Sequence, residues 1–316
     1  MINSIPSATA INEAYQRIRP FINHTPVITS GTINMMFGSN IFFKCENFQK
    51  VGAFKARGAT NAVQSLERET LARGVATHSS GNHAQALSWA AGIAGARAYI
   101  VMPSNSSPVK IAAVRGYGGL ITFCEPTLEA RETTLQKVIE ETGAVEIHPY
   151  NDVRIIAGQA TSALELIKEI PGLDIIIAPV GGGGLLSGTA LSVHYFNKGA
   201  IVVAAEPEQA DDAYRSFITG EFVPSVNPQT IADGLRTSLG SITFPIIGEH
   251  VSSIVTVSED SIVKAMKFIW ERMKIIVETS SAVPFAAIME NKIDIKGKRV
   301  GLIFSGGNVD LNDLPW

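Results

Sequence analysis

Residues 174–185 read Asp-Ile-Ile-Ile-Ala-Pro-Val-Gly-Gly-Gly-Gly-Leu, so an apolar run passes directly into four consecutive glycines. The β-branched run predicts a buried strand, and the apolar stretch at 185–197 predicts a helix. Consecutive glycines let the backbone approach a ligand closely, and the exposed N–H groups at a helix start favour an anion. A flexible turn would explain one glycine, but four glycines in this context predict a phosphate site. The residues expected to bind that phosphate are Gly181, Gly182, Gly183, Gly184 and Leu185.

The same alternation of strand and helix extends in both directions from this stretch. Runs typical of strands lie at residues 41–45, 75–78, 98–102, 120–124, 174–178, 201–205 and 299–304. Runs typical of helices lie at residues 55–68, 82–94, 108–114, 128–142, 155–170, 185–197 and 259–273. This order predicts an α/β fold with two mostly parallel, open sheets flanked by helices. We expect a large domain of residues 1–72 and 151–316, a small domain of residues 73–150, and a long loop at 220–245.

Composition and charge exclude several classes of protein. With 316 residues, 46% of them hydrophobic and 17% charged, the chain has enough apolar material for two cores. The net charge of −3 lacks the basic excess that nucleic-acid binding requires. No apolar run approaches the ~20 residues of a membrane-spanning helix, and the first residues lack the pattern of a secretory signal. Only two cysteines, Cys45 and Cys124, are present, which favours a reducing, cytoplasmic location.

A second candidate segment, residues 47–59, carries Lys55 at the expected start of a helix. A lysine is unfavourable there, because the helix dipole prefers anions at that end. The same field, together with burial, would lower the pKa of the amine and leave it free to attack an aldehyde. An ordinary surface lysine is the simpler interpretation of the residue alone. A lysine and a phosphate cradle together, however, suit a phosphorylated aldehyde.

Two further turns follow predicted strands. Residues 77–85 read Thr-His-Ser-Ser-Gly-Asn-His-Ala-Gln, and the hydroxyl and amide groups beside this helix start suit either a bound carboxylate or a helix cap. Binding and capping are compatible at this turn. Residues 304–310 read Phe-Ser-Gly-Gly-Asn-Val-Asp, which by themselves predict only a turn.

In this order, the segments resemble the fold-type II pyridoxal-phosphate enzymes, whose fold is that of the tryptophan synthase β-subunit. More narrowly, they resemble the serine racemases, the threo-3-hydroxyaspartate dehydratases and the serine/threonine dehydratases. The similarity extends from Thr25 to Leu311. It is most specific in FFKCENFQKVGAFKARGA at 42–59, THSSGNHAQAL at 77–87, IAPVGGGGLLSG at 177–188, AAEPEQADD at 204–212 and SGGNVDL at 305–311. The resemblance implies a pyridoxal 5′-phosphate cofactor, a small amino-acid substrate and a homodimer.

The resemblance also assigns roles to the residues that match the family pattern. Lys55 would form the Schiff base with the cofactor and, once released, would remove the substrate α-proton. Phe54 would lie against the pyridine ring, Asn82 would hydrogen-bond the 3′-oxygen, and Ser305 would meet the pyridine nitrogen. The residues that would take the substrate α-carboxylate are Ser79, Ser80, Gly81, Asn82 and His83.

Three residues bear on the choice of substrate. Plain serine/threonine dehydratases usually have alanine where Ser80 stands. In racemase-like members this serine lies on the substrate face opposite the lysine, so the resemblance permits racemisation. Arg131 and His78 match residues of hydroxyaspartate-acting relatives, and an arginine fork suits a second carboxylate. An ion pair of Arg131 with Glu129 or Glu132 on the helix surface is the alternative.

A metal site is implied as well. In the racemase-like members a divalent cation binds to residues that match Glu206, Asp212 and the carbonyl of Ala210. Carboxylate and carbonyl oxygens suit Mg²⁺, Ca²⁺ or Mn²⁺. Without the resemblance, these residues would be interpreted as solvated charge at the end of a strand.

The resemblance thus predicts dehydration and deamination of threo-3-hydroxyaspartate or serine to a 2-oxo acid and ammonia, with possible racemase activity. An L-threonine/L-serine dehydratase is the alternative. A β-replacement synthase of the cysteine synthase type would instead join a nucleophile to the substrate, and a cofactor carrier would bind without turnover. The polar run Thr279-Ser280-Ser281, where relatives often have glycine and alanine, weakens the transfer of a relative's substrate to this chain.

Overall fold

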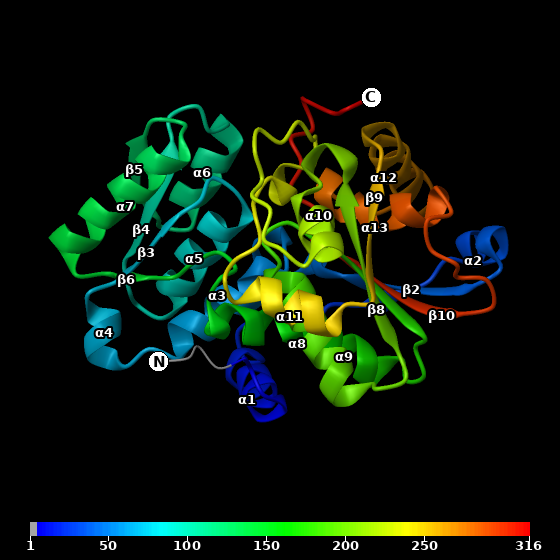
Figure 1. Ribbon diagram of the computed structural model, residues 1–316. Coiled ribbons are helices and arrows are strands. Elements are labelled where there is room, and N and C mark those ends of the chain that lie inside the picture. Colours follow the sequence, from blue (N-terminus) through cyan, green and yellow to red (C-terminus); the bar gives the residue numbers. More distant parts are fainter. Residues whose placement is uncertain (1–4) are drawn as a thin grey trace.

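Two β-sheets organise the chain, and helices cover both faces of each (Figure 1). The structure is a computed structural model and describes residues 5–316. The larger sheet has the strand order β1-β2-β10-β7-β8-β9, and only β1 pairs antiparallel. Its strands are Val27–Ile28 (β1), Asn40–Cys45 (β2), Ile175–Pro179 (β7), Ile201–Pro207 (β8), Ser253–Val257 (β9) and Arg299–Phe304 (β10). The predicted α/β class is confirmed.

The smaller sheet has the order β5-β4-β3-β6 and is parallel throughout. Its strands are Val75–His78 (β3), Ala98–Pro103 (β4), Leu120–Cys124 (β5) and Val145–Glu146 (β6). Parallel neighbours require crossover connections, which the helices provide. On one face, α7 (Leu128–Thr142) packs against Ala76 and Val101. On the other face, α5 (Asn82–Ile93) packs against Val75 and Ile100.

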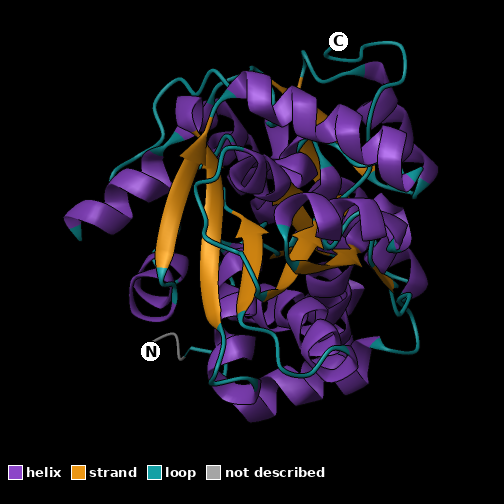
Figure 2. Cartoon of the chain, turned by 90° about the vertical axis from the view of Figure 1, so that its right-hand side faces the viewer, coloured by secondary structure: helices purple, strands orange, loops and turns teal. Residues whose placement is uncertain are grey.

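Alternate residues of the central strand β7 face opposite sides of the larger sheet, as the two-residue period of a strand requires. Ile175 and Ile177 pack against α12 (Glu259–Met273) and α13 (Thr279–Met289). Ile176 and Ala178 pack against α8 (Val153–Glu169) and α9 (Gly184–Phe196). Figure 2 shows the twisted sheet with helices on either side. Burial on both faces explains why the strand is continuously apolar in the sequence.

The remaining elements include several that the sequence does not predict. They are α1 (Ala8–Ile18), α2 (Gly31–Phe37), α3 (Lys55–Gln64), α4 (Arg68–Ala72), α6 (Pro108–Gly116), α10 (Asp212–Thr219), α11 (Thr243–His250), η1 (Glu46–Phe48), η2 (Lys50–Gly52), η3 (Glu208–Ala210) and η4 (Asp233–Leu235). The single helix predicted at 55–68 is wrong, because α3 ends at Gln64 and a separate helix begins at Arg68. The loop predicted at 220–245 ends before Thr243, where α11 begins.

Helix α3 joins the two sheets. Its alanines, such as Ala56, contribute to the core of the smaller sheet. On its other side Arg57 forms ion pairs with Glu46 and Glu165, each at 2.7 Å. Lys44 from β2 also pairs with Glu165 at 2.7 Å. All four charged side chains are buried, so the helix is tied to the larger sheet by a buried ion network.

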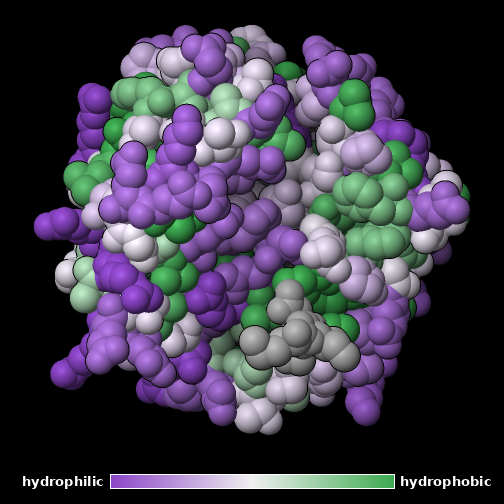
Figure 3. Space-filling view, turned by 60° about the vertical axis from the view of Figure 1, so that its left-hand side comes forward, coloured by the Kyte–Doolittle hydropathy of each residue, from purple (hydrophilic) through white to green (hydrophobic). Residues whose placement is uncertain are grey.

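The face that includes the smaller sheet is mainly polar, and its apolar side chains form separate patches (Figure 3). Scattered apolar side chains are ordinary on the surface of a folded protein. No helix within residues 5–316 has both the length and the apolar composition to cross a bilayer.

Candidate active site

The carboxyl ends of the parallel strands bring the predicted segments together, as expected for an open α/β sheet. Strands β2, β10 and β7 are neighbours in the larger sheet, and they lead into the Lys55 segment, the Ser305 turn and the glycine loop 181–184. The Phe54 N–H donates to the Ser305 carbonyl at 2.9 Å, and Ala53 forms a β-bridge with Gly306. The segments around Lys55 and Ser305, far apart in the sequence, therefore lie side by side.

Lys55 is the first residue of α3, in agreement with the sequence pattern. Its Nζ donates a hydrogen bond to the Pro149 carbonyl at 2.8 Å and lies 5.2 Å from the centroid of the Phe54 ring. Burial lowers the pKa of the Lys55 amine to about 8, and the Glu278 carboxylate opposes that shift. The amine is therefore a weaker base than an ordinary lysine and has a larger neutral fraction near neutral pH.

The glycine loop has no room for side chains. A Cβ on Gly181 would lie 2.9 Å from the Leu235 Cα, and a Cβ on Gly182 would overlap the Tyr150 ring. Gly183 has a φ of 86° and precedes α9 without a side-chain cap bond. The first N–H groups of α9 therefore remain available to a ligand. This geometry fits the predicted phosphate site.

The Asn82 amide at the start of α5 is held on both sides. Its Nδ2 donates to the two carboxylate oxygens of Glu278, at 2.9 and 3.1 Å. Its Oδ1 accepts a hydrogen bond from the Asn308 Nδ2 at 2.9 Å. Burial raises the pKa of Glu278 to about 7. The orientation of Asn82 is therefore fixed by the protein itself.

Ser79, Ser80 and Gly81 form a half-buried turn between β3 and α5. The Ser79 N–H donates to the Val101 carbonyl at 3.1 Å. Gly81 is the N-cap of α5, and no side chain caps this helix. The alternative in which these serines cap the helix is therefore wrong, and the first N–H groups of α5 point out of the helix end.

Three histidines lie near this turn, and burial lowers the pKa of each. The pKa of His83 falls to about 3 and that of His148 to about 4, so both are neutral at physiological pH. The His83 Nε2 donates to the Ile147 carbonyl at 3.0 Å. The His148 Nδ1 accepts the Asn151 N–H at 2.9 Å, so its proton is on Nε2. His78 is the third member, and its ring centroid is 6.4 Å from that of His148.

Arg131 lies on α7 near the same group. After burial, the Arg131 guanidinium is the next cause of the lowered pKa of His78. The Arg131 Nε donates to the Thr127 carbonyl at 3.3 Å. The alternative ion pair with Glu129 or Glu132 is absent from the ion pairs of residues 5–316. The charge of Arg131 is thus available near the histidines.

Sequence reasoning missed the segment 147–152 that completes the site. Pro149 accepts the hydrogen bond from Lys55, and the Tyr150 ring lies against the glycine loop. The centroid of the Tyr150 ring is 4.6 Å from that of the His148 ring. The run His-Pro-Tyr-Asn-Asp follows a strand end and precedes a helix, which is the signal that identifies the other turns. It is missed because β6, the strand before it, has only two residues.

Two buried carboxylates lie at the end of β8 and the start of α10. The Glu206 oxygens accept the N–H groups of Ala213 and Tyr214 at 3.0 and 2.8 Å. Neither carboxylate oxygen of Asp212 has a hydrogen-bond partner in the described part of the chain. Burial raises the pKa of Glu206 to about 9 and that of Asp212 to about 6. Ala210 is buried beside them in η3, and residues 5–316 contain no cluster of three or more His, Cys, Asp or Glu side chains arranged for a metal.

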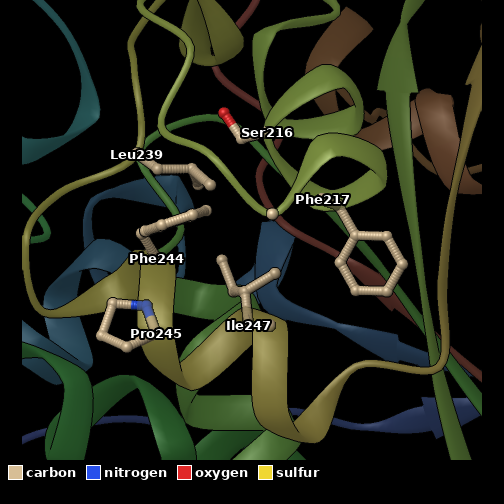
Figure 4. Close-up of a pocket in the computed structure, with 8 residues that line it drawn as sticks. Ser216, Phe217, Leu239, Phe244, Pro245 and Ile247 are labelled. Atoms are coloured by element: carbon tan, nitrogen blue, oxygen red, sulfur yellow. The ribbon is translucent and has the colours of Figure 1, made fainter.

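A separate apolar pocket of about 270 Å³ lies between α10 and α11 (Figure 4). Its lining includes Ser216, Phe217, Leu239, Phe244, Pro245 and Ile247. The Ser216 hydroxyl donates to the Asp212 carbonyl at 2.7 Å, so the hydroxyl hydrogen is already used. Ile247 also supports the glycine loop, because a Cβ on Gly183 would lie 2.8 Å from its Cδ1. This pocket could therefore accommodate an apolar group, but it has few free polar groups to bind a ligand.

Comparison with known proteins identifies the family. Residues 18–306 match the family described as pyridoxal-phosphate dependent enzyme. A β-hydroxyaspartate dehydratase from Paracoccus denitrificans (strain Pd 1222) is 52% identical and covers 99% of both chains. The serine racemase of Dictyostelium discoideum is 50% identical and covers 96% of this chain and 95% of its own. The solved structure of maize serine racemase has a TM-score of 0.96 at 43% identity, covering 98% of this chain and 95% of its own. With its fold, its half-buried Lys55 and its glycine loop, this chain belongs to the pyridoxal-phosphate-dependent enzymes.

Proposed function

We propose that the chain catalyses β-elimination on a small β-hydroxy amino acid, with threo-3-hydroxyaspartate preferred over serine, to give a 2-oxo acid and ammonia. The observation that carries the proposal is the half-buried Lys55 amine, with a pKa of about 8, beside the glycine loop and the Ser305 turn. The 52% identity to a β-hydroxyaspartate dehydratase supports the choice of substrate. The cofactor site belongs to a large domain of residues 1–72 and 151–316, and a small domain of residues 73–150 contributes the turn for the substrate carboxylate.

The residues present fit pyridoxal 5′-phosphate. Backbone N–H groups from Gly181 to Leu185 would hold its phosphate, at a loop where a Cβ would clash with the backbone or a ring. Lys55 would bind the aldehyde carbon, and Phe54, Asn82 and Ser305 would contact the ring. When bound, the cofactor supplies the electron sink that stabilises negative charge at the substrate α-carbon.

The side chains of the site then bind the substrate and move its protons. The Lys55 amine accepts the α-proton, a role suited to a base whose pKa is about 8. The turn from Ser79 to His83 binds the α-carboxylate through its hydroxyls and the exposed N–H groups at the start of α5. The neutral His148 keeps a fixed Nε2–H donor beside this turn.

An assay of ammonia release tests the proposal directly. Both threo-3-hydroxyaspartate enantiomers, L- and D-serine and L-threonine would be compared, and hydroxyaspartate should have the highest kcat/KM. Borohydride reduction followed by peptide mapping should place the cofactor adduct on Lys55. A highest kcat/KM with L-threonine would favour the threonine dehydratase instead, and an amino-acid product with an added thiol would favour the synthase. No adduct on Lys55 would overturn every cofactor-based version.

Arg131 is proposed to bind the second carboxylate of hydroxyaspartate. Its guanidinium has no ion-pair partner in the described chain, and its charge reaches His78. Arg131→Ala should lower kcat/KM for hydroxyaspartate about tenfold or more and change kcat/KM for serine little. Arg115→Ala on α6 is a matched control, and an unchanged substrate ratio in Arg131→Ala would exclude the role.

Racemisation is a second candidate activity, which the hydroxyl of Ser80 favours. Ser80 does not cap α5, so its hydroxyl remains free to return a proton to the substrate face opposite Lys55. Ser80→Ala should abolish any interconversion of L- and D-serine and leave most of the elimination. Chiral analysis of the remaining substrate provides the measurement, and equal loss of both activities would contradict the assignment.

A divalent cation is proposed at Glu206, Asp212 and the Ala210 carbonyl. The two unpartnered oxygens of the buried Asp212 support it, because a buried carboxylate needs a cation or a proton. After chelation, Mg²⁺, Ca²⁺ or Mn²⁺ should raise the thermal midpoint of the protein, and NaCl of equal ionic strength should not. Asp212→Asn should remove the cation effect.

A homodimer in a reducing, cytoplasmic compartment completes the proposal. Phe48 and Ile276 are 45% and 46% exposed, and the Asn47 side chain, hydrogen-bonded to the Ile276 carbonyl, places them near each other. Both cysteines are free thiols. Phe48→Lys should shift the mass measured by light scattering to that of a monomer. Ile201→Lys changes an equally exposed residue elsewhere, and it should leave the dimer intact.

A further inference from the structure

The first turn of α13 carries three consecutive hydroxyl side chains, Thr279, Ser280 and Ser281. Ser280 and Ser281 are almost fully buried, at 2% and 0% exposure, so solvent does not satisfy their hydroxyls. Their hydroxyls contact two different loops of the proposed cofactor site.

Ser280 contacts the loop behind the phosphate end. Its Oγ accepts the Gly234 N–H at 3.1 Å. The next residue, Leu235, lies against the glycine loop, since a Cβ on Gly181 would be 2.9 Å from its Cα. Ser280 therefore supports the backbone that would hold the phosphate.

Ser281 contacts the turn at the other end. Its Oγ accepts the Gly306 N–H at 3.4 Å. The Gly306 carbonyl also accepts the Glu278 N–H at 3.0 Å, so both peptide groups of Gly306 are bonded to this end of α13. Gly306 follows Ser305, the residue assigned to the pyridine nitrogen. Ser281 therefore supports the backbone that orients the Ser305 hydroxyl.

We propose that Ser280 and Ser281 are positioning residues for opposite ends of the bound cofactor, Ser280 for the phosphate and Ser281 for the pyridine nitrogen. The inference rests on the proposed function, which assigns the glycine loop and Ser305 to those ends. The first turn of α13 thus sets the distance between the glycine loop and the Ser305 turn. Each serine hydroxyl acts through one of these loops and does not contact the cofactor itself.

The two serines can be tested against each other, because they share residue type, helical turn and burial. Ser280→Ala should weaken binding of inorganic phosphate and of pyridoxal 5′-phosphate to the apoenzyme about fivefold, the loss of one hydrogen bond. The absorbance of its bound cofactor should stay that of the parent protein. Ser281→Ala should shift the absorbance maximum and its pH dependence, which report the state of the ring nitrogen. Its phosphate affinity should stay within about twofold of the parent.

Ser280→Thr and Ser281→Thr retain the hydroxyl and should restore the respective readout, which a general loss of stability would not do. The inference is overturned if both alanine variants change the same readout, or if neither changes any. Borohydride trapping on the parent protein distinguishes a failure of this inference from a failure of the proposed function. If the parent protein forms the adduct on Lys55 but the two alanine variants behave alike, only the inference about the serines is overturned. If the parent protein forms no adduct, the proposed function itself is overturned.

Discussion

Arg57 and Lys55 occupy the same helix, α3, but their charged groups have different partners. Arg57, Lys44, Glu46 and Glu165 form short ion pairs in a fully buried network. Lys55, by contrast, donates to a carbonyl oxygen, and its pKa is lowered to about 8 by burial. Paired charges of this kind hold elements together, whereas a partly buried amine without an ion-pair partner costs stability.

The carboxylates show the same contrast. Burial raises the pKa of the Glu46 carboxyl, but Arg57, Lys44 and the Thr25 hydroxyl together outweigh burial and hold that pKa below its usual range. Asp212 lacks hydrogen-bond partners on both oxygens within residues 5–316, and burial raises its pKa to about 6. The Glu46 carboxylate is therefore stabilised by a partner within the protein, whereas the Asp212 carboxylate is not. The difference teaches where to look for chemistry in a fold of this kind: at the charges that the protein leaves unsatisfied.

The largest expected effect is that of Lys55→Met on activity. Removing the proposed base should lower kcat by at least about 10³-fold. The thermal midpoint of the apoprotein should rise at the same time, because methionine fills a similar volume and has no charge to bury. A Lys55→Met apoprotein with a lower thermal midpoint than the parent would contradict the contrast between the unpaired charge of Lys55 and the paired charge of Arg57.

The next effect is that of Arg57→Met on stability. It leaves Glu46 and Glu165 buried without their main partner and should cost about 3–5 kcal/mol of unfolding free energy. Denaturant titration of the apoprotein measures the loss. Arg57→Lys keeps the positive charge but loses the forked guanidinium. Its unfolding free energy should therefore lie between those of the parent and Arg57→Met. A loss below about 1 kcal/mol in Arg57→Met would contradict the structural role of the network.

A smaller, pH-dependent effect sharpens the contrast at Lys55. Between pH ~8 and the ordinary lysine value of ~10.5, the unfolded chain retains a proton that the folded chain has lost. The contribution of Lys55 to stability therefore rises with pH across this window. The difference in thermal midpoint between the Lys55→Met and parent apoproteins should narrow from pH 8 to 10.5. A constant difference would mean that the Lys55 pKa is not shifted.

The smallest effect is expected at an exposed pair. Lys264 and Asp260 lie one turn apart on α12, 2.5 Å from each other, and their side chains are 63% and 74% exposed. Lys264→Ala should change the unfolding free energy by less than about 0.5 kcal/mol, because solvent screens the pair. An effect as large as that of Arg57→Met would show that burial is not what separates the two classes.

Much of the fold could be predicted from the sequence because the strands of both sheets are short, apolar and separated by helices. The glycine loop could be located because it follows a strand and opens a helix, and Lys55 because it follows a glycine-containing turn and opens a helix. Pro149 and Tyr150 could not, because their contacts with Lys55 and Gly182 depend on packing between distant segments. The unpartnered oxygens of Asp212 are likewise a property of the folded chain alone.

The dual attachment of α3 has a mechanical consequence. The ion pairs of Arg57 on α3 with Glu46 and Glu165 are short and directional. The alanines of α3 contact the smaller sheet by van der Waals packing, which has little directional preference. A rotation between the sheets would therefore slide the smaller sheet along the alanines and leave α3 with the larger one. Lys55 would keep its alignment with the glycine loop and Ser305. The Ser79–His83 turn would move, and the hydrogen bonds that join Asn82 to Glu278 and Asn308 would have to break.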